Sequence, residues 1–191
     1  MRIGFIRHGS TSWNKEKRAQ GSSDIHLDDE GRLHATKLAE RLNEEKWDVI
    51  FSSGLARAYQ TATIIADSLD LEVIIDNRLR EAGGGQIEGT TEVERINKWG
   101  PNWRELDLGI EKADLVVARA QEAIEEFHQS YEDKNILIVS HGSFLHHFFK
   151  SALPELDHEK HLVNTSLTIL NKQQDEWTHE IYNSTSHLNR S

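Results

Sequence analysis

The stretch RIGFIRHG, residues Arg2–Gly9, shows the pattern that decides the fold: a short apolar strand that ends in a polar cluster. The segment Arg2–Ile6 has the continuous apolar character of a strand that is buried on both faces of a parallel sheet. The pattern returns in NILIVSHG, residues Asn135–Gly142, where an apolar run is again followed by histidine and glycine. We therefore expect two buried strands that each end in a histidine.

Strands and helices are predicted to alternate along the rest of the chain. Asp28 is a suitable N-cap for a helix whose apolar stripe consists of Ala35, Leu38, Ala39 and Leu42. The other expected elements are strands at Val49–Phe51 and Leu71–Ile75, helices at Leu55–Leu69, from Ala113 to about Phe127 and at Ser143–Leu153, and alternating edge strands at Ser166–Leu170 and Trp177–Tyr182. This alternation predicts an α/β three-layer sandwich, with a mostly parallel central sheet covered by helices on both faces.

Composition limits the classes of function. A length of 191 residues suits one compact domain, and we expect residues 1–191 to form it. The net charge of −10 argues against a nucleic-acid partner, although a local cluster of arginines can still bind an anion. The chain has no cysteine, which excludes disulfides and thiolate nucleophiles. Apolar runs are only strand-sized and the N-terminus begins with a strand pattern, so we expect a cytoplasmic protein without a membrane partner.

Three polar clusters follow three predicted strands. They are Arg7–Gly9, Ser52–Arg57 and His141–Gly142. In an open α/β sheet the carboxyl ends of neighbouring strands form the ligand crevice, so residues distant in sequence meet there. Two histidines and two arginines in one crevice would suit a dianionic phosphoryl group, with a nitrogen nucleophile and forked donors for its oxygens.

Five blocks of sequence together resemble those of the histidine phosphatase superfamily, which includes cofactor-dependent phosphoglycerate mutase and many small phosphatases. The blocks are RHGSTSWN (Arg7–Asn14), then Gln20, Gly21 and Asp24, then SSGLARAYQTA (Ser52–Ala62), LRE (Leu79–Glu81) and VSHG (Val139–Gly142). The resemblance covers almost the whole chain and points to the small phosphatase branch. It implies that His8 accepts the phosphoryl group and that Glu81 is the general acid. It also implies a phosphate and substrate pocket formed by Arg7, Asn14, Gln20, Gly21, Arg57, His141 and Gly142.

Each block has an ordinary structural explanation when it is taken alone. A single histidine is more often structural than catalytic, and Arg57 alone would fit the solvated face of an amphipathic helix. The ordered set of blocks, each at a strand end, favours the site over these explanations. His141, His146 and His147 are not expected to bind a metal, because neighbouring helical positions point in different directions and no paired carboxylate completes the set. We therefore expect neither a metal nor a cofactor.

The chain departs from the family pattern in two places. Gly54 and Ala56 stand where relatives often have proline and a second basic residue, and Ala82–Gly85 replaces an expected aromatic residue. The segment between Glu81 and Ala113 is also short compared with the mutase branch, which favours hydrolysis. Four residues in that segment form either a lid over the substrate or an ordinary loop anchored by buried tryptophans: Trp99, Pro101, Trp103 and Arg104.

The sequence therefore predicts a phosphomonoesterase that hydrolyses a small phosphorylated metabolite through a phosphohistidine on His8, without a metal. Two alternatives stay open at this point: a mutase of the phosphoglycerate mutase type, and a non-catalytic module that binds a phosphorylated ligand. The expected oligomeric state is a monomer or a homodimer.

Overall fold

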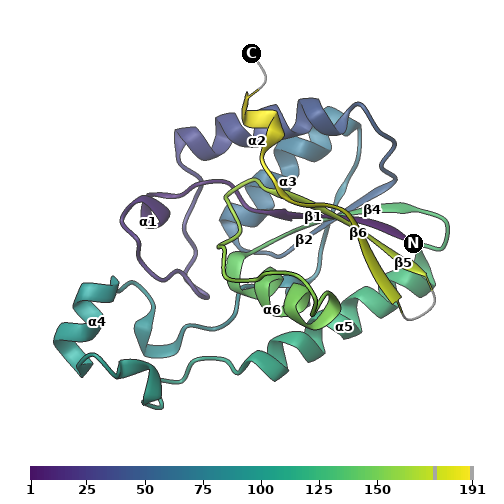
Figure 1. Ribbon diagram of the computed structural model, residues 1–191. Coiled ribbons are helices and arrows are strands. Elements are labelled where there is room, and N and C mark those ends of the chain that lie inside the picture. Colours follow the sequence, from purple (N-terminus) through teal and green to yellow (C-terminus); the bar gives the residue numbers. More distant parts are fainter. Residues whose placement is uncertain (174–175, 190–191) are drawn as a thin grey trace.

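A central sheet runs through the molecule (Figure 1). The computed structural model describes residues 1–173 and 176–189. Within these ranges the strands are β1 (Arg2–Arg7), β2 (Val49–Ser52), β3 (Val73–Ile75), β4 (Asn135–Ser140), β5 (Leu167–Gln173) and β6 (Glu176–Ser184). Their order is β3-β2-β4-β1-β5-β6. The first four strands pair in parallel, whereas β5 and β6 are antiparallel to their neighbours.

Helices cover both faces of this sheet. The α-helices of the described residues are α1 (Ser12–Lys15), α2 (Asp29–Leu42), α3 (Ala56–Leu69), α4 (Glu92–Trp99), α5 (Ala113–Ser130) and α6 (Gly142–Ala152). The 3-10 turns are η1 (Asn77–Leu79), η2 (Gly85–Ile87), η3 (Trp103–Glu105) and η4 (Ser186–Asn189). In Figure 1, α2 and α3 lie on one side of the sheet and α5 and α6 on the other. The predicted three-layer arrangement is confirmed.

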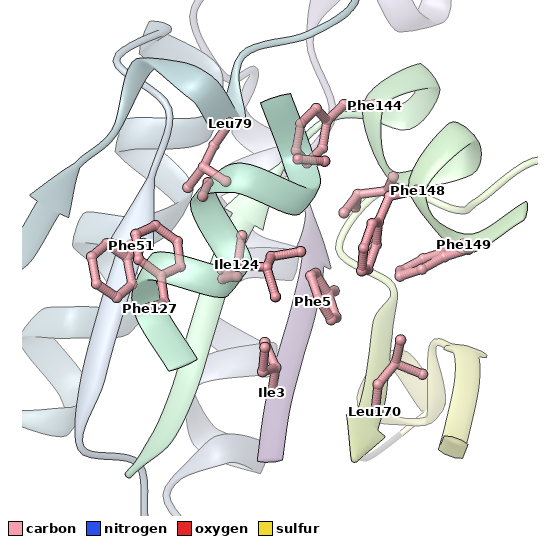
Figure 2. Packing of buried hydrophobic residues seen from close by; sticks show 14 of the residues in the cluster. Ile3, Phe5, Phe51, Leu79, Ile124, Phe127, Phe144, Phe148, Phe149 and Leu170 are labelled. Atoms are coloured by element: carbon pink, nitrogen blue, oxygen red, sulfur yellow. The ribbon is translucent and has the colours of Figure 1, made fainter. Parts of the chain in front are cut away.

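The side chains of successive strand residues point to opposite faces of the sheet and so belong to two different hydrophobic cores, as the two-residue period of a strand requires. Ile3 and Phe5 of β1 belong to the core under α5 and α6, which Figure 2 shows, whereas Ile6 belongs to the core under α2 and α3. In the first core, Phe51 stacks on Phe127 with ring centroids 3.8 Å apart. Because both faces are buried, the central strands require continuous apolar runs.

The predicted helix after Asp28 is confirmed in detail. The Asp28 side chain accepts a hydrogen bond of 2.7 Å from the Gly31 amide and caps α2. All four residues of the predicted apolar stripe are buried: Ala35, Leu38, Ala39 and Leu42. The cap and the stripe together therefore fix where this helix begins and which face it packs on the sheet.

The third strand begins two residues later than predicted, at Val73 rather than Leu71. The cause lies at the end of α3, where Asp70 adopts a left-handed conformation with φ of 54°. The Leu71 amide then bonds to the Ala66 carbonyl and closes the helix. Leu71 is consequently part of the helix termination and is not available to the strand.

The segment between Glu81 and Ala113 contains the helix α4, which is not among the elements predicted from the sequence. A capping box at Thr91 and Glu94 starts this helix. Trp103 is buried, and the guanidinium groups of Arg95 and Arg104 lie 4.8 and 4.2 Å from its ring. In Figure 1 this part of the chain extends away from the sheet. For Trp103 the structure thus supports the anchored loop rather than a contact with substrate.

Candidate active site

The register of three parallel strands brings the predicted histidines together. Arg7 of β1 pairs with Ser140 of β4, so the next residues along each strand, His8 and His141, lie side by side. Their ring centroids are 5.2 Å apart. Since Ser52 of β2 pairs with Val139, the following residue, Ser53, lies on the other side of His141. The carboxyl edge of the sheet therefore presents Ser53, His141 and His8 in a row.

His8 is held in one orientation and one tautomer. Its Nδ1 lies 2.7 Å from the Gly9 carbonyl oxygen, which only accepts hydrogen bonds, so Nδ1 carries the hydrogen and donates. Asn164 fixes the same backbone by donating to the His8 carbonyl oxygen at 2.9 Å. The other ring nitrogen, Nε2, is consequently unprotonated and is available as a nucleophile.

The two predicted arginines both reach this edge, and each has a spare buried donor. Arg57 is fully buried at the start of α3 and donates to the Gly21 and Ser23 carbonyl oxygens at 2.8 and 2.7 Å. Arg7 donates from Nη1 to the Leu162 carbonyl oxygen. The Nε atoms of both side chains are buried without a partner among the described residues. A bound anion would supply the acceptors that these donors lack.

His141 has a partner that the sequence analysis did not assign. Its Nε2 lies 2.6 Å from the Ser53 hydroxyl oxygen, and that oxygen accepts a weaker bond of 3.4 Å from the Leu55 amide. This arrangement favours donation of the hydroxyl hydrogen to Nε2, which places the imidazole hydrogen on Nδ1. Among the residues described, that Nδ1 is buried and has no partner. His141 is thus prepared to donate to an oxygen of a ligand.

The Glu81 carboxylate lies at the first turn of α6, the helix that follows His141. Its carboxylate accepts hydrogen bonds from the amides of Phe144, Ser143 and Ala82, at 2.8, 3.1 and 2.8 Å. Negative charge is favoured at a helix N-terminus, and His141 itself gives this helix no side-chain cap. These bonds hold the Glu81 carboxylate at the entrance of the site.

The structure separates the remaining predicted residues into two groups. Asn14 and Gly142 line the cavity at Arg7. A Cβ atom on Gly142 would lie 3.3 Å from Arg7 Nε, so a larger residue there would press on the Arg7 side chain. Gln20 and Gly21 instead line a smaller adjoining cavity that also touches Glu81. Gly21 contributes through its backbone, since its carbonyl oxygen binds Arg57.

The cavity at Arg7 has a volume of about 560 Å³. Its wall also contains residues that the sequence analysis did not place in the site. The lining residues are Arg7, Asn14, Glu81, Gly142, Ser143, His146, His147, His158, Glu159, His161, Leu162 and Asn164. The loop residues among them follow no strand end, so sequence position alone gives no signal for them.

Burial and positive charge both act on the two histidines. Burial lowers the pKa of His8 and of His141 well below 6.5, and the charges of Arg57 and Arg7 lower both further. Both imidazoles are therefore neutral at pH 7. Burial also lowers the pKa of Arg57 to about 10, which still leaves the guanidinium charged at neutral pH. The site thus combines neutral nitrogens with fixed positive charge, as an anionic ligand requires.

These pKa shifts predict a loss of stability on acidification. Below about pH 6.5 the unfolded chain protonates both histidines while the folded chain does not, so protons favour unfolding. Each histidine should reduce the free energy of unfolding by about 1.4 kcal/mol per pH unit as the pH falls from 6.5 towards its folded-state pKa. Denaturant titrations at several pH values between 5 and 7, about the range in which histidine titrates, measure this slope.

The double variant His8→Asn, His141→Asn is the comparison for this prediction. It removes both titrating groups, and the slope should become smaller by up to about 2.8 kcal/mol per pH unit. Asp28 and Glu45, whose pKa values are lowered in the fold, contribute only at more acidic pH. Equal slopes for the wild type and the double variant would show that the two histidines do not resist protonation.

Comparisons with known proteins agree with this geometry. Residues 3–185 match the family model of the histidine phosphatase superfamily (branch 1). The chain is 33% identical to phosphoglycerate mutase-like protein 4 of Arabidopsis thaliana, with 97% of this chain and 86% of the relative covered. It is 31% identical to the uncharacterized phosphatase PhoE of Bacillus subtilis, with 96% and 95% covered. A mycobacterial glucosyl-3-phosphoglycerate phosphatase, solved with VO3, superimposes with a TM-score of 0.86 at 29% identity, with 96% and 99% covered.

A mostly parallel sheet with paired histidines and arginines at its carboxyl edge defines a class of α/β proteins whose site suits phosphoryl groups. The family match over almost the whole chain makes the assignment specific. This chain belongs to the histidine phosphatase superfamily.

Proposed function

We propose that this protein is a phosphomonoesterase that hydrolyses a small phosphorylated metabolite through a covalent phosphohistidine on His8. The observation that carries the proposal is the hydrogen bond from His8 Nδ1 to the Gly9 carbonyl oxygen, next to three buried nitrogens, on Arg7, Arg57 and His141, that have no partner among the described residues. The bond leaves the nucleophilic Nε2 free, and the three nitrogens are donors for the oxygens of a phosphoryl group.

The proposed reaction has two displacement steps. In the first, His8 Nε2 forms a bond to phosphorus while the bond from phosphorus to the ester oxygen breaks, and Glu81 gives its proton to the leaving alkoxide. In the second, water attacks the phosphohistidine, the nitrogen–phosphorus bond breaks, and the Glu81 carboxylate takes the proton of the water. Inorganic phosphate and an alcohol leave, and His8 and Glu81 return to their starting states.

Arg7, Arg57 and His141 stabilise the charge on the transferring group in this account. Phosphoryl transfer depends mainly on positioning and electrostatic stabilisation of the equatorial oxygens. The three donors are fixed before substrate binds, by the Leu162 carbonyl oxygen, the Gly21 and Ser23 carbonyl oxygens and the Ser53 hydroxyl group. Little reorganisation is then needed when the transition state forms.

Replacing Glu81 with glutamine should slow substrates according to their leaving groups. An alkyl phosphate needs a proton on its leaving oxygen, so kcat/KM should fall by about 10²- to 10⁴-fold. A nitrophenyl phosphate expels a stable phenolate that needs no proton. Its kcat/KM should therefore fall much less than that of the alkyl phosphate. The glutamine oxygen still accepts hydrogen bonds from the amides at the start of α6, which limits structural damage. Steady-state kinetics with the two esters provide the test, and equal losses on both would remove Glu81 from the role of general acid.

A mutase is the second candidate, because one relative carries the name phosphoglycerate mutase-like. Such an enzyme would return the phosphoryl group to a second hydroxyl group instead of to water. It would show isomerase activity that depends on a bisphosphorylated primer and would release little inorganic phosphate. A binding module would bind phosphorylated ligands without turnover. Assays of phosphate release and of isomerisation on the same sample distinguish the three functions.

Hydrolysis should persist when divalent cations are removed. Among residues 1–173 and 176–189, no group of three or more His, Asp or Glu side chains is placed to hold a metal ion. In the proposed reaction, arginines supply the positive charge that a metal would otherwise provide. Activity on an aryl phosphate, measured before and after exhaustive dialysis against a chelator, should agree within about twofold. Abolition by the chelator and recovery on adding back one cation would contradict a mechanism without metal.

Small phosphorylated metabolites are the proposed ligands because of the size of the cavity. A volume of about 560 Å³ lies within the usual range for small-molecule sites.

Among the described residues, no helix has both the length and the apolar character needed to cross a membrane.

A further inference from the structure

The loop that carries Glu81 has no regular structure of its own. Residues 80–84, between the turns η1 and η2, form neither helix nor strand. Backbone carbonyl oxygens outside helices and strands need other hydrogen-bond partners wherever the protein covers them. Because the proposed reaction requires the Glu81 carboxyl group at one place, whatever holds this loop contributes to the site.

Side chains from α5 and β4 bond to four successive carbonyl oxygens at this loop. The acceptors are the carbonyl oxygens of Arg78, Leu79, Arg80 and Glu81. Arg119 of α5 donates to the first, third and fourth of them, at 2.6, 2.7 and 3.2 Å, and the Ser140 hydroxyl group donates to the second at 2.7 Å. One guanidinium group thus fixes the backbone that leads to Glu81 and the backbone of Glu81 itself.

The same guanidinium group also holds the chain on the far side of Glu81. Its Nε and Nη2 donate to the Glu111 carboxylate at 2.9 and 3.1 Å. That carboxylate accepts from the Gly83 amide at 2.9 Å, and the Glu111 amide donates to the Gly83 carbonyl oxygen at 2.8 Å. The bonds from Arg119 lower the pKa of Glu111, which keeps it charged at neutral pH. We call Arg119 and Glu111 the clamp.

The clamp also contacts the helix that holds the Glu81 carboxylate. The Arg119 guanidinium group lies 5.0 Å from the centre of the Phe144 ring, and the Phe144 amide donates to the Glu81 carboxylate. Phe144 is fully buried in the core under α5 and α6, and Figure 2 shows it at the same end of that core as Leu79. The backbone of Glu81 and one donor to its side chain therefore both contact the same guanidinium group.

We propose that Arg119, together with Glu111, is a positioning residue that keeps the Glu81 carboxyl group where it can give its proton to the leaving oxygen. The inference rests on the proposed function, because it requires Glu81 as the general acid. Neither side chain of the clamp lines the cavity at Arg7, so the clamp acts through Glu81 and not on the phosphoryl group.

Arg119→Lys tests this role with two esters. A lysine ammonium group keeps the charge, but it cannot bond to three carbonyl oxygens and to Glu111 at once. A displacement of about 1 Å can cost about 10²-fold in rate, so kcat/KM for an alkyl phosphate should fall by about 10- to 10²-fold. For a nitrophenyl phosphate, whose leaving group needs no proton, kcat/KM should fall by less than about threefold. A side chain that only stabilises the fold would not distinguish the two esters.

A double-variant cycle shows whether Arg119 acts through Glu81. In enzyme that already contains Glu81→Gln, adding Arg119→Lys should change kcat/KM for the alkyl phosphate by less than about twofold, because the effects of residues that act as a unit do not add. A further loss in the double variant as large as the loss in Arg119→Lys alone would overturn the inference.

Glu111→Gln is the milder second variant. Its amide oxygen can still accept from the Gly83 amide, but the ion pair with Arg119 is lost. The alkyl phosphate should therefore lose about three- to tenfold in kcat/KM, and the nitrophenyl phosphate should lose less. If Arg119→Lys does not fold, as its thermal melting would show, Glu111→Gln decides alone.

Two ion pairs outside the site provide matched controls. Arg41 pairs with Glu45, and its side chain is 18% exposed compared with 19% for Arg119. Glu125 lies on α5, as Arg119 does, and pairs with Lys172. Arg41→Lys and Glu125→Gln should leave kcat/KM for both esters unchanged.

The possible failures can be distinguished. If Glu81→Gln distinguishes the two esters but the clamp variants slow both equally, or slow neither, the role of the clamp is overturned while the proposed function stands. If Glu81→Gln itself slows both esters equally, the general acid of the proposed function fails and the inference fails with it.

Discussion

Replacing His8 with alanine should lower kcat for phosphomonoester hydrolysis by about 10⁴-fold or more. The imidazole is the group that forms the bond to phosphorus, and loss of a nucleophile leaves only the contribution of the binding groups. In the described part of the chain no other nucleophile is placed between Arg7 and Arg57 with one ring nitrogen fixed by a backbone carbonyl oxygen. Phosphate release, measured with concentrated enzyme over long times, gives the size of the loss.

The His8 variant must be shown to fold and to bind inorganic phosphate. His8→Asn is the closer replacement, because its amide can still donate to the Gly9 carbonyl oxygen. Both variants should keep inorganic phosphate affinity within about tenfold of the wild type, since the arginines are intact. His179→Gln, on β6, controls for the loss of a histidine as such. A kcat within tenfold of the wild type in the alanine variant would remove His8 from the role of nucleophile.

Replacing Arg57 with lysine should lower kcat/KM by about 10²- to 10³-fold, although the charge is kept. One guanidinium group at this position bonds to the Gly21 and Ser23 carbonyl oxygens, and its buried Nε has no partner in the part of the chain that the structure describes. A lysine ammonium is a single point and cannot reach both carbonyl oxygens and a phosphoryl oxygen at once. The loss of one donor fixed on the transition state amounts to about 3 kcal/mol, which is this factor in rate.

The lysine variant should have a lower kcat as well as a lower affinity for substrate, because the Arg57 donor acts on the charge that develops in the transition state. Arg41→Lys is the matched control: Arg41 lies on α2 and pairs with Glu45 outside the cavity. Its kinetic constants should equal those of the wild type. Unchanged kcat in Arg57→Lys, with only KM raised, would mean that Arg57 binds the ground state and does not assist the transfer.

The central fold was predictable because its strands are buried on both faces. The sheet requires continuous apolar runs such as Ile136–Val139, and such runs are visible in a sequence. The arrangement of Glu92–Glu105 was not predictable in the same way. There the structure depends on local contacts of Trp103 with Arg95 and Arg104, which leave no periodic signal.

The candidate site was predictable as far as strand ends determine it. His8 and His141 follow paired residues of neighbouring strands, so their proximity follows from topology. The Ser53 hydroxyl group at His141 depends on side-chain rotamers, and no pattern indicates it. The cavity at Arg7 includes residues from an irregular segment, whose position is set by contacts such as that of His158 with the Leu153 carbonyl oxygen.

Trapping the covalent intermediate tests the account most directly. The enzyme is mixed with a nitrophenyl phosphate, quenched rapidly in denaturant at alkaline pH, where phosphohistidine survives, and digested for mass spectrometry. We expect one phosphoryl group on the peptide that contains His8, located on that imidazole, which forms and decays fast enough to support turnover. A phosphoryl group on another residue, or continued turnover with no phosphoenzyme at any quench time, would contradict it.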